Sequence, residues 1–285
     1  MINALTIDLE DWYQGLTSTS QQVDRWPNFE DRVVTSTEHL LTILAEANVQ
    51  ATFFVLGYVA DQFPELIKQV ATAGHEIGLH GYYHRQVFRL TPEQFRQEML
   101  RGRDAVEAAS GQQVLGHRAP MFSINRSCLW ALEILHELGF WYDSSIFPTK
   151  NMLYGFPDAP RFPYQPISQT DFIEFPLSTV HLWGMNWPIA GGFYLRLLPH
   201  AFISWGIKRL NKEGHPAVIY LHPWELDPDH PRPNPTPRER FTHYHNLHRM
   251  EAKLKALLRK HQFAPMSSLF ANGSYSKPLE STWKF

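Results

Sequence analysis

The chain has 285 residues, 44% of them hydrophobic, with 26 basic against 28 acidic side chains, 15 histidines and a single cysteine, Cys128. This length corresponds to one large domain or two ordinary ones, and the apolar share is enough for a sizeable core. One cysteine excludes an internal disulfide and a cysteine-rich zinc site, so any metal must be held by histidines and carboxylates. The net charge of -2 gives no electrostatic reason to expect nucleic acid or an anionic membrane as a partner.

The first eight residues lack the basic and apolar regions of a secretory signal, so we expect a cytoplasmic location. No uncharged apolar run in the sequence is long enough to span a bilayer. We therefore predict no transmembrane segment.

The first half of the chain alternates short apolar runs with helical patterns, which is typical of strand and helix units around a parallel sheet. The apolar runs predict strands over residues 4–7, 51–56, 75–80 and 114–118. The amphipathic patterns predict helices over residues 33–47, 64–73, 92–109 and 127–138. Gly74 and Gly139 stand where two of these helices should end.

The composition changes between residues 147 and 192, where many prolines and aromatics indicate irregular segments and edge strands. We interpret residues 148–192 as an insertion within one domain that spans residues 1–270, because no linker divides the chain. Further on, the patterns predict a helix over 199–213, a strand over 217–221, a helix over 243–261 and a last strand at 263–266. The Pro-rich segment 227–242 is a candidate for a loop that covers a site, and residues 271–285 form a polar tail.

Two histidines, His80 and His84, stand four residues apart at the end of a predicted strand. On a helical turn this spacing brings the two imidazoles together, as one metal ion requires. Strand ends are also where α/β folds place their sites. The alternative is a pair of unrelated surface histidines, which is how we interpret the group at positions 243, 245 and 248.

Three carboxylates, Asp8, Glu10 and Asp11, follow the first predicted strand. They repel one another unless a cation or a basic group compensates them. One carboxylate and the two histidines would make a site for Zn²⁺ or a similar divalent ion that holds a hydrolytic water. A second carboxylate, for which Asp8 is well placed, would serve as the general base. The alternative is an exposed turn with an N-cap aspartate.

Two further side chains end predicted strands. His222 follows an apolar run and could protonate a leaving group, or it could be a buried imidazole with a structural partner. Arg118 could pair with the base carboxylate and orient it, or form a plain structural salt bridge.

These residues form four motifs: Thr6-Ile7-Asp8, His80-x-x-x-His84, Arg118-x-Pro120 and Leu221-His222-Pro223. In order and approximate spacing they resemble the polysaccharide deacetylases of the NodB-homology type, carbohydrate esterase family 4. The resemblance covers roughly residues 4 to 225. The acidic motif reads Asp-Leu-Glu-Asp-Trp where the family commonly has Thr-Phe-Asp-Asp-Gly, and this form resembles the branch associated with exopolysaccharide biosynthesis loci.

The resemblance implies an α/β fold, a distorted (β/α) barrel of about seven strands, here with the irregular Pro- and aromatic-rich insertion. It also implies metal-dependent hydrolysis of N-acetyl groups of amino sugars in a polysaccharide or its precursor, with release of acetate. Carried onto this sequence, Asp8 matches the catalytic base, Arg118 the arginine that positions it, and His222 the general acid. His80 and His84 match two metal ligands.

The third ligand departs from the family pattern, in which it directly follows the base. That position is Leu9 here, which cannot bind metal. We assign Asp11, because a short carboxylate is the family's usual ligand, with Glu10 as the alternative because it shares a strand face with Asp8 if the strand continues. The metal is expected to be zinc, with cobalt as a possible substitute.

The expected partner is an N-acetylated amino-sugar polymer or oligomer, and we assign its binding to Trp12, Tyr82, Pro120 and Trp224. Other aromatics, Tyr13, Trp183 and Trp187, are either sugar-stacking platforms or core residues. Three other functions stay open. They are hydrolysis of cyclic amides or ureides by an allantoinase-like relative of the same fold, carbohydrate binding by an inactive barrel, and a structural role in a polysaccharide synthesis complex.

Overall fold

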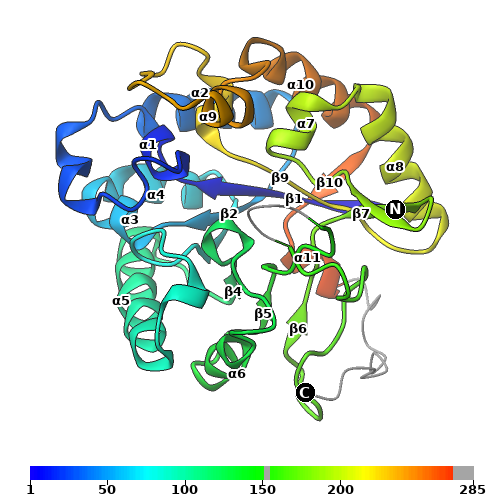
Figure 1. The fold of residues 1–285 in the computed structure, drawn as a ribbon, viewed down its shortest axis with the longest axis horizontal. Helices are drawn as coiled ribbons and strands as arrows, with labels where there is room; N and C mark the ends of the chain where they lie inside the picture. The colour runs from blue at the N-terminus through cyan, green and yellow to red at the C-terminus, as the bar shows by residue number, and fades with distance from the viewer. Residues whose placement is uncertain (151–154, 272–285) are drawn as a thin grey trace.

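A computed structural model of the protein describes residues 1–150 and 155–271 (Figure 1). The strands are β1 (Ile2–Leu9), β2 (Thr52–Val55), β3 (Glu76–Leu79), β4 (Gly116–His117), β5 (Tyr142–Asp143), β6 (Ile173–Glu174), β7 (Thr179–Leu182), β8 (Met185–Pro188), β9 (Val218–Leu221) and β10 (Gln262–Ala264). The helices are α1 (Trp12–Gly15), α2 (Val33–Glu46), α3 (Gly57–Gln62), α4 (Pro64–Thr72), α5 (Pro92–Ser110), α6 (Trp130–Glu137), α7 (Phe193–Leu197), α8 (His200–Lys212), α9 (Pro237–Thr242), α10 (Met250–Lys260) and α11 (Ser267–Ala271).

Within the described residues, one parallel sheet contains every strand except β7 and β8. Its strands follow one another in the order β9-β1-β2-β3-β4-β5-β6, and β10 pairs with the first residues of β1. The sheet curls, and helices such as α2, α5 and α10 lie around its outside (Figure 1). This arrangement confirms the predicted distorted (β/α) barrel.

Strand β1 divides its side chains between two cores. Leu5, Ile7 and Leu9 belong to the outer core that the helices cover. Ala4, by contrast, packs with Phe54, Tyr220 and other residues in the interior of the curl. Because successive side chains of a strand point to opposite faces, the even-numbered positions after Ala4 also face the interior. Polar residues late in β1 therefore project toward the inside of the barrel at its carboxyl end.

The segment 148–192 is only partly the insertion that the sequence predicts. Residues Ile173–Glu174 form β6, which pairs in parallel with β5 and so extends the main sheet. Strands β7 and β8 form a separate antiparallel hairpin. The sequence predicted edge strands in this segment without placing them, and it missed β5, because strands of two residues are too short to show a periodic pattern.

Most predicted helices are present with ends shifted by a few residues, but two segments differ. The helix expected from residue 243 begins at Met250, because Asn246 has a φ of 57° and interrupts it. The Pro-rich segment 227–242 is not all loop, since it contains α9. Its Thr236 accepts a hydrogen bond from the Glu239 N–H and, like the prolines, fits the start of a helix.

Apart from Ala271 at the end of α11, the predicted polar tail lies outside the described residues. Among the helices that the structure describes, none combines the length and apolar character needed to cross a bilayer.

Candidate active site

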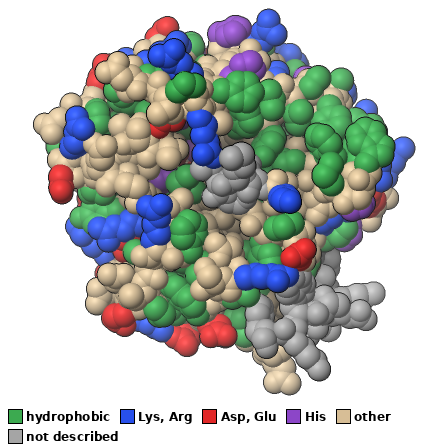
Figure 2. All heavy atoms as spheres, in the orientation of Figure 1, with side chains coloured by type: hydrophobic (Ala, Val, Ile, Leu, Met, Phe, Trp, Pro, Cys, Tyr) green, Lys and Arg blue, Asp and Glu red, His purple; other side chains and the backbone are tan. Residues whose placement is uncertain are grey.

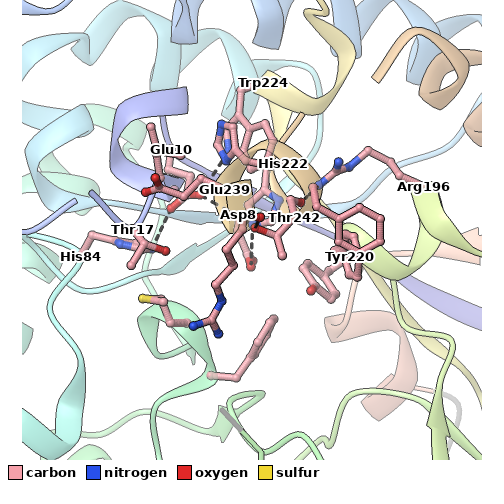
Figure 3. Close-up of a pocket in the computed structure, with 18 of the residues that line it drawn as sticks. Asp8, Glu10, Thr17, His84, Arg196, Tyr220, His222, Trp224, Glu239 and Thr242 are labelled. Carbon is pink, nitrogen blue, oxygen red and sulfur yellow. Dashed lines mark hydrogen bonds and ion pairs between the residues drawn. The ribbon is translucent and has the colours of Figure 1, made fainter. Parts of the chain in front are cut away.

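The residues singled out for chemistry lie at the carboxyl ends of four strands of the parallel sheet. Asp8 is near the end of β1, His80 directly follows β3, Arg118 follows β4 and His222 follows β9. Since these strands are parallel, their ends meet at one edge of the sheet. Asp8, His80 and His222 line one pocket of about 280 Å³ there. Figure 3 labels Asp8 and His222 among the side chains of this pocket.

A buried carboxylate lies between the two histidines of the predicted metal site. The Oε2 atom of Glu10 lies 2.8 Å from Nε2 of His84 and 4.0 Å from Nε2 of His80. One ligand atom from each of the three residues falls within 4.8 Å of the others. This set of two imidazoles and one carboxylate leaves open positions on a cation, as catalytic zinc sites do.

The contacts around this cluster fit a divalent cation. No residue in the described part of the chain donates a well-formed hydrogen bond to Glu10 Oε2. Nδ1 of His80 lies 2.9 Å from the Arg118 carbonyl, so it donates there and leaves Nε2 with its lone pair toward Glu10. Buried acceptors without partners are rare, so the position of Glu10 Oε2 between two imidazole nitrogens fits a site for a cation.

The second oxygen of Glu10 is held in place by the indole of Trp224. Its Nε1–H donates to Glu10 Oε1 over 3.2 Å. A side chain at Gly15 would begin 2.5 Å from the same oxygen, so the site requires glycine there. Burial would raise the pKa of Glu10, but the charges of His84, His222 and His80 lower it below its ordinary value. Glu10 is therefore an anion at neutral pH, as a metal ligand must be.

His80 and His84 come together without the helical turn that the sequence suggested. The chain from residue 80 to 84 is irregular, with Gly81 at a φ of 76° and His84 at 54°. The ring centroids are 5.4 Å apart. Glycine takes such a conformation readily and ends any helix at this point, so the loop itself sets the spacing of the imidazoles.

The structure does not bring the preferred third ligand, Asp11, to the two histidines, and Glu10, the stated alternative, lies there instead. Asp11 caps α1, and its Oδ1 accepts the Trp12 N–H at 2.7 Å. Its Oδ2 accepts the N–H groups of Arg32 and Val33 at 2.8 and 2.9 Å, at the start of α2. The alternation along β1 explains the difference, because Glu10 shares the inward face of Asp8.

Asp8 lies beside the cluster of Glu10, His80 and His84 and forms an ion pair with Arg118. The Arg118 Nη1–H donates to Asp8 Oδ1 at 2.8 Å and to Thr6 Oγ1 at 2.7 Å. Ser144 holds the other guanidinium nitrogens through its carbonyl and its hydroxyl, both at 2.9 Å. The arginine is fully buried, and all of its nitrogens are engaged. It fixes one oxygen of Asp8 and leaves the other, Oδ2, 4.0 Å from Nε2 of His222.

His222 is held by a buried ion-pair chain that the sequence did not indicate. Glu225 Oε2 lies 3.1 Å from Nδ1 of His222, and Glu225 Oε1 accepts the Arg196 Nε–H at 2.6 Å. Burial would lower the pKa of His222, but Glu225, Glu10 and Asp8 together raise it to about 9. The imidazolium form therefore predominates at neutral pH, which suits a proton donor. Arg196 is far from Glu225 in the sequence, so no local pattern links them.

The rest of the pocket comes largely from the second half of the chain. Its walls include Leu16, Thr17, Met121, Phe122, Phe193, Arg196, Tyr220, Arg238, Glu239, Phe241, Thr242 and His243. Four of them belong to α9. The end of segment 227–242 therefore lines the site, as the sequence predicted for this segment. Figure 3 shows Glu239 and Thr242 on the same side of the pocket as Trp224 and His222.

Three of the four assigned substrate-binding residues do not line this pocket. Trp12 is 1% exposed and donates its indole N–H to the Glu30 carbonyl. Tyr82 is buried between α3 and α5, where its hydroxyl donates to Asp61. Pro120 is buried and faces Gly81. An aromatic beside a motif and an aromatic in the core look alike in a sequence.

The remaining aromatic candidates divide between the pocket and other places. Trp224 lines the pocket, where its ring stacks on His222 at 4.9 Å and on His243 at 3.9 Å. Tyr13 is a core residue, whose hydroxyl donates to Asp31. Trp183 and Trp187 belong to the β7–β8 hairpin.

Comparison with known proteins agrees with this geometry. The family model "Polysaccharide deacetylase" matches residues 24–141, and "Domain of unknown function (DUF3473)" matches residues 144–271. Residues 24–141 therefore carry a polysaccharide deacetylase domain. Asp8, Glu10 and His222 lie outside the matched range of this deacetylase domain, although they share its pocket.

The relatives of this deacetylase domain include a peptidoglycan-N-acetylglucosamine deacetylase of Bacillus cereus, 33% identical over 98 residues, which are 34% of this chain and 36% of the relative. A chitooligosaccharide deacetylase of Bradyrhizobium is 40% identical over 86 residues, 30% of this chain and 39% of the relative. The matches thus span between 36% and 39% of the lengths of these curated relatives.

Among solved structures, a Mycobacterium smegmatis protein assigned to the polysaccharide deacetylases is similar in fold, with a TM-score of 0.63 and 23% sequence identity. The similarity covers 99% of this chain and 93% of that one. The whole described chain, including the half that the deacetylase model does not match, therefore belongs to one known fold.

Proposed function

We propose that this protein is a metal-dependent deacetylase that hydrolyses N-acetyl groups of amino sugars in a glycan and releases acetate. The observation that carries the proposal is the buried cluster of Glu10, His80 and His84, with Asp8 and His222 beside it, 4.0 Å from each other. The match to the polysaccharide deacetylase model supports the same reaction.

Glu10, His80 and His84 would hold a divalent ion, which we propose to be zinc, with cobalt as a substitute. Two imidazoles and a carboxylate are a common zinc ligand set in hydrolases. When bound, such an ion lowers the pKa of water and polarises a carbonyl.

Asp8 would remove a proton from the attacking water through Oδ2, the oxygen that Arg118 leaves free. Because the guanidinium is bound on three sides, it keeps the carboxylate in one orientation during the transfer. His222, charged and held by Glu225, would protonate the nitrogen of the leaving amine. The base and the acid lie 4.0 Å apart, so both reach one tetrahedral centre.

The substrate we propose is a polymer or oligomer that contains N-acetylglucosamine. Two relatives carry names that refer to peptidoglycan N-acetylglucosamine and to chitooligosaccharides. A pocket of about 280 Å³ with the rings of Phe193 and Phe241 in its wall has room for one sugar with its acetamido group. The branch associated with exopolysaccharide loci and a cytoplasmic location remain predictions from the sequence.

The test is acetate release from N-acetylchitooligosaccharides by the metal-stripped protein before and after addition of Zn²⁺ or Co²⁺. We expect release by the wild type with metal, loss of release in Asp8→Asn, and wild-type release in Asp24→Asn, whose carboxylate is exposed. Equal release by the wild type and Asp8→Asn would contradict the role of the base. Hydrolysis of allantoin without acetate release would favour a cyclic-amide hydrolase, and glycan binding without hydrolysis would favour an inactive barrel.

A further inference from the structure

The β7–β8 hairpin lies outside the main sheet and exposes aromatic side chains. Its two strands are antiparallel and are joined at Trp183 and Gly184, which have φ angles of 50° and 75°. Hairpin turns in which both central residues have positive φ usually contain Asn-Gly, because a bulky residue at positive φ is strained. Trp183 is nevertheless 85% exposed. A strained and exposed tryptophan at a hairpin tip indicates a contact surface.

The second tryptophan of the hairpin lines a cavity of its own. Trp187 and Tyr194 contribute to the walls of a cavity of about 540 Å³, separate from the catalytic pocket. Trp183 packs edge-on against Trp187, with ring centroids 6.3 Å apart. The Trp187 Nε1–H has no acceptor among the described residues, so the ring keeps an unused donor.

The same cavity is also lined by residues with planar polar groups, His181 and Asn186. Nδ1 of His181 lies 2.8 Å from Oδ1 of Asn186, across the hairpin. The Thr149 hydroxyl donates to the Asn186 carbonyl at 3.0 Å and ties the hairpin to the chain that follows β5. The His181 and Asn186 side chains both line the cavity. A sugar presents an apolar face to an aromatic ring and hydroxyls around its edge, and this wall offers partners for both.

Consecutive residues of α7 line this cavity and the catalytic pocket. Phe193 lines the catalytic pocket, and the next residue, Tyr194, lines the hairpin cavity. Their ring centroids are 5.6 Å apart. The hairpin also packs on α8, where Gly206 faces Val180. Figure 2 shows hydrophobic side chains gathered over α7 and α8, on the side of the molecule where Figure 1 places β7.

We infer that the hairpin cavity binds further sugar residues of the glycan whose N-acetyl group occupies the catalytic pocket. The inference rests on the proposed function. A concave wall of two aromatic rings with an imidazole and an amide beside them fits a sugar chain. A membrane-binding surface would instead present a broad apolar face with basic residues around it. The substrate is thus an oligomer or polymer rather than a single amino sugar.

The first test compares acetate release from N-acetylchitohexaose and N-acetylchitobiose. We expect the wild type to have the higher kcat/KM with the hexamer. In Trp187→Ala the ratio of hexamer to dimer kcat/KM should fall about tenfold, as removal of a buried aromatic contact typically does. The control is Trp141→Ala, which removes another exposed tryptophan, 59% exposed and lining neither cavity, and should keep the wild-type ratio. An unchanged ratio in Trp187→Ala would overturn the inference.

The second test needs no catalysis. The hexamer is titrated into Asp8→Asn and into Asp8→Asn with Trp187→Ala, and binding is measured by calorimetry. We expect the affinity to fall about tenfold in the double variant. If no glycan releases acetate but binding still depends on Trp187, the proposed reaction fails and the glycan site stands. If the dimer is hydrolysed but the Trp187→Ala change does not alter hexamer binding, the glycan site is contradicted and the proposed reaction is not. The same holds if Trp183→Ala changes only binding to lipid vesicles.

Discussion

The two halves of the chain build their parts of the active site in different ways. In the first 141 residues, regular strand and helix units bring Glu10, His80 and His84 together at strand ends. In residues 144–271 two of the strands, β7 and β8, lie outside the main sheet, and His222 is held by the side chains of Glu225 and Arg196. The metal site therefore depends on backbone topology, whereas the proton donor depends on a chain of buried charges.

The largest difference between the halves should appear when the two proton-transfer residues are removed in turn. Asp8→Asn should lower kcat/KM for acetate release by about 10³-fold, and His222→Gln by about 10²-fold, within the usual range for a general base and a general acid. Both variants should still bind zinc, because neither residue belongs to the ligand cluster. Steady-state kinetics with zinc quantified in the same samples would check this, and metal loss in either variant would contradict it.

The next prediction concerns which of two carboxylates in the first half, Glu10 or Asp11, binds the metal. Glu10→Gln should weaken zinc binding by more than the roughly 10- to 100-fold that loss of a supporting group costs. Asp11→Asn should keep zinc and instead lower the free energy of unfolding by about 1 kcal/mol, because it weakens a cap shared by α1 and α2. Titration against a competing chelator and thermal unfolding measure the two effects. Zinc loss in Asp11→Asn but not in Glu10→Gln would reverse the assignment.

In the second half, the charge of Glu225 should control the alkaline side of the pH profile. Glu225 is ionised at neutral pH, since burial alone would raise its pKa but Arg196 and His222 lower it to about 2. The pKa of His222 is raised to about 9, so the protonated acid persists below that pH and kcat/KM falls as the pH rises through it. Glu225→Gln removes a negative charge and should move this fall to lower pH. An alkaline limb that does not move would show that Glu225 does not act on His222.

The smallest effects should come from two matched helix caps, one in each half. Thr91 caps α5 and Thr236 caps α9, each accepting a backbone N–H at 3.2 Å. Replacement by alanine should lower the free energy of unfolding by about 1 kcal/mol or less in each case. Only Thr236→Ala should also raise KM, because α9 lines the catalytic pocket whereas α5 does not. Equal KM values in the two variants would contradict a role for α9 in binding.

Much of the first half could be predicted from the sequence. Alternating strands and helices predicted the barrel, and the motif order predicted that Asp8 and Arg118 meet, which they do at 2.8 Å. The choice of Glu10 over Asp11 was also available, because strand alternation alone places Glu10 on the inward face. The preference for Asp11 rested instead on the short carboxylate that is the usual ligand of the family.

The second half was predicted less well for physical reasons. Strand β6 is two residues long and carries no periodic signal. Arg196 and Glu225 meet through the tertiary fold, 29 residues apart, and nothing local marks them as partners. Trp12 and Tyr82 stand beside motif residues but are buried, and burial of an aromatic cannot be told from its neighbours in the chain.

Arg196 also supports the wall of the catalytic pocket. Besides Glu225, it donates to the carbonyls of Thr242, at the end of α9, and of His245, both at 2.8 Å. The same guanidinium thus bonds to the group that orients His222 and to the wall that closes the pocket. Loss of this one side chain would therefore disturb both the orientation of His222 and the position of the wall that α9 forms.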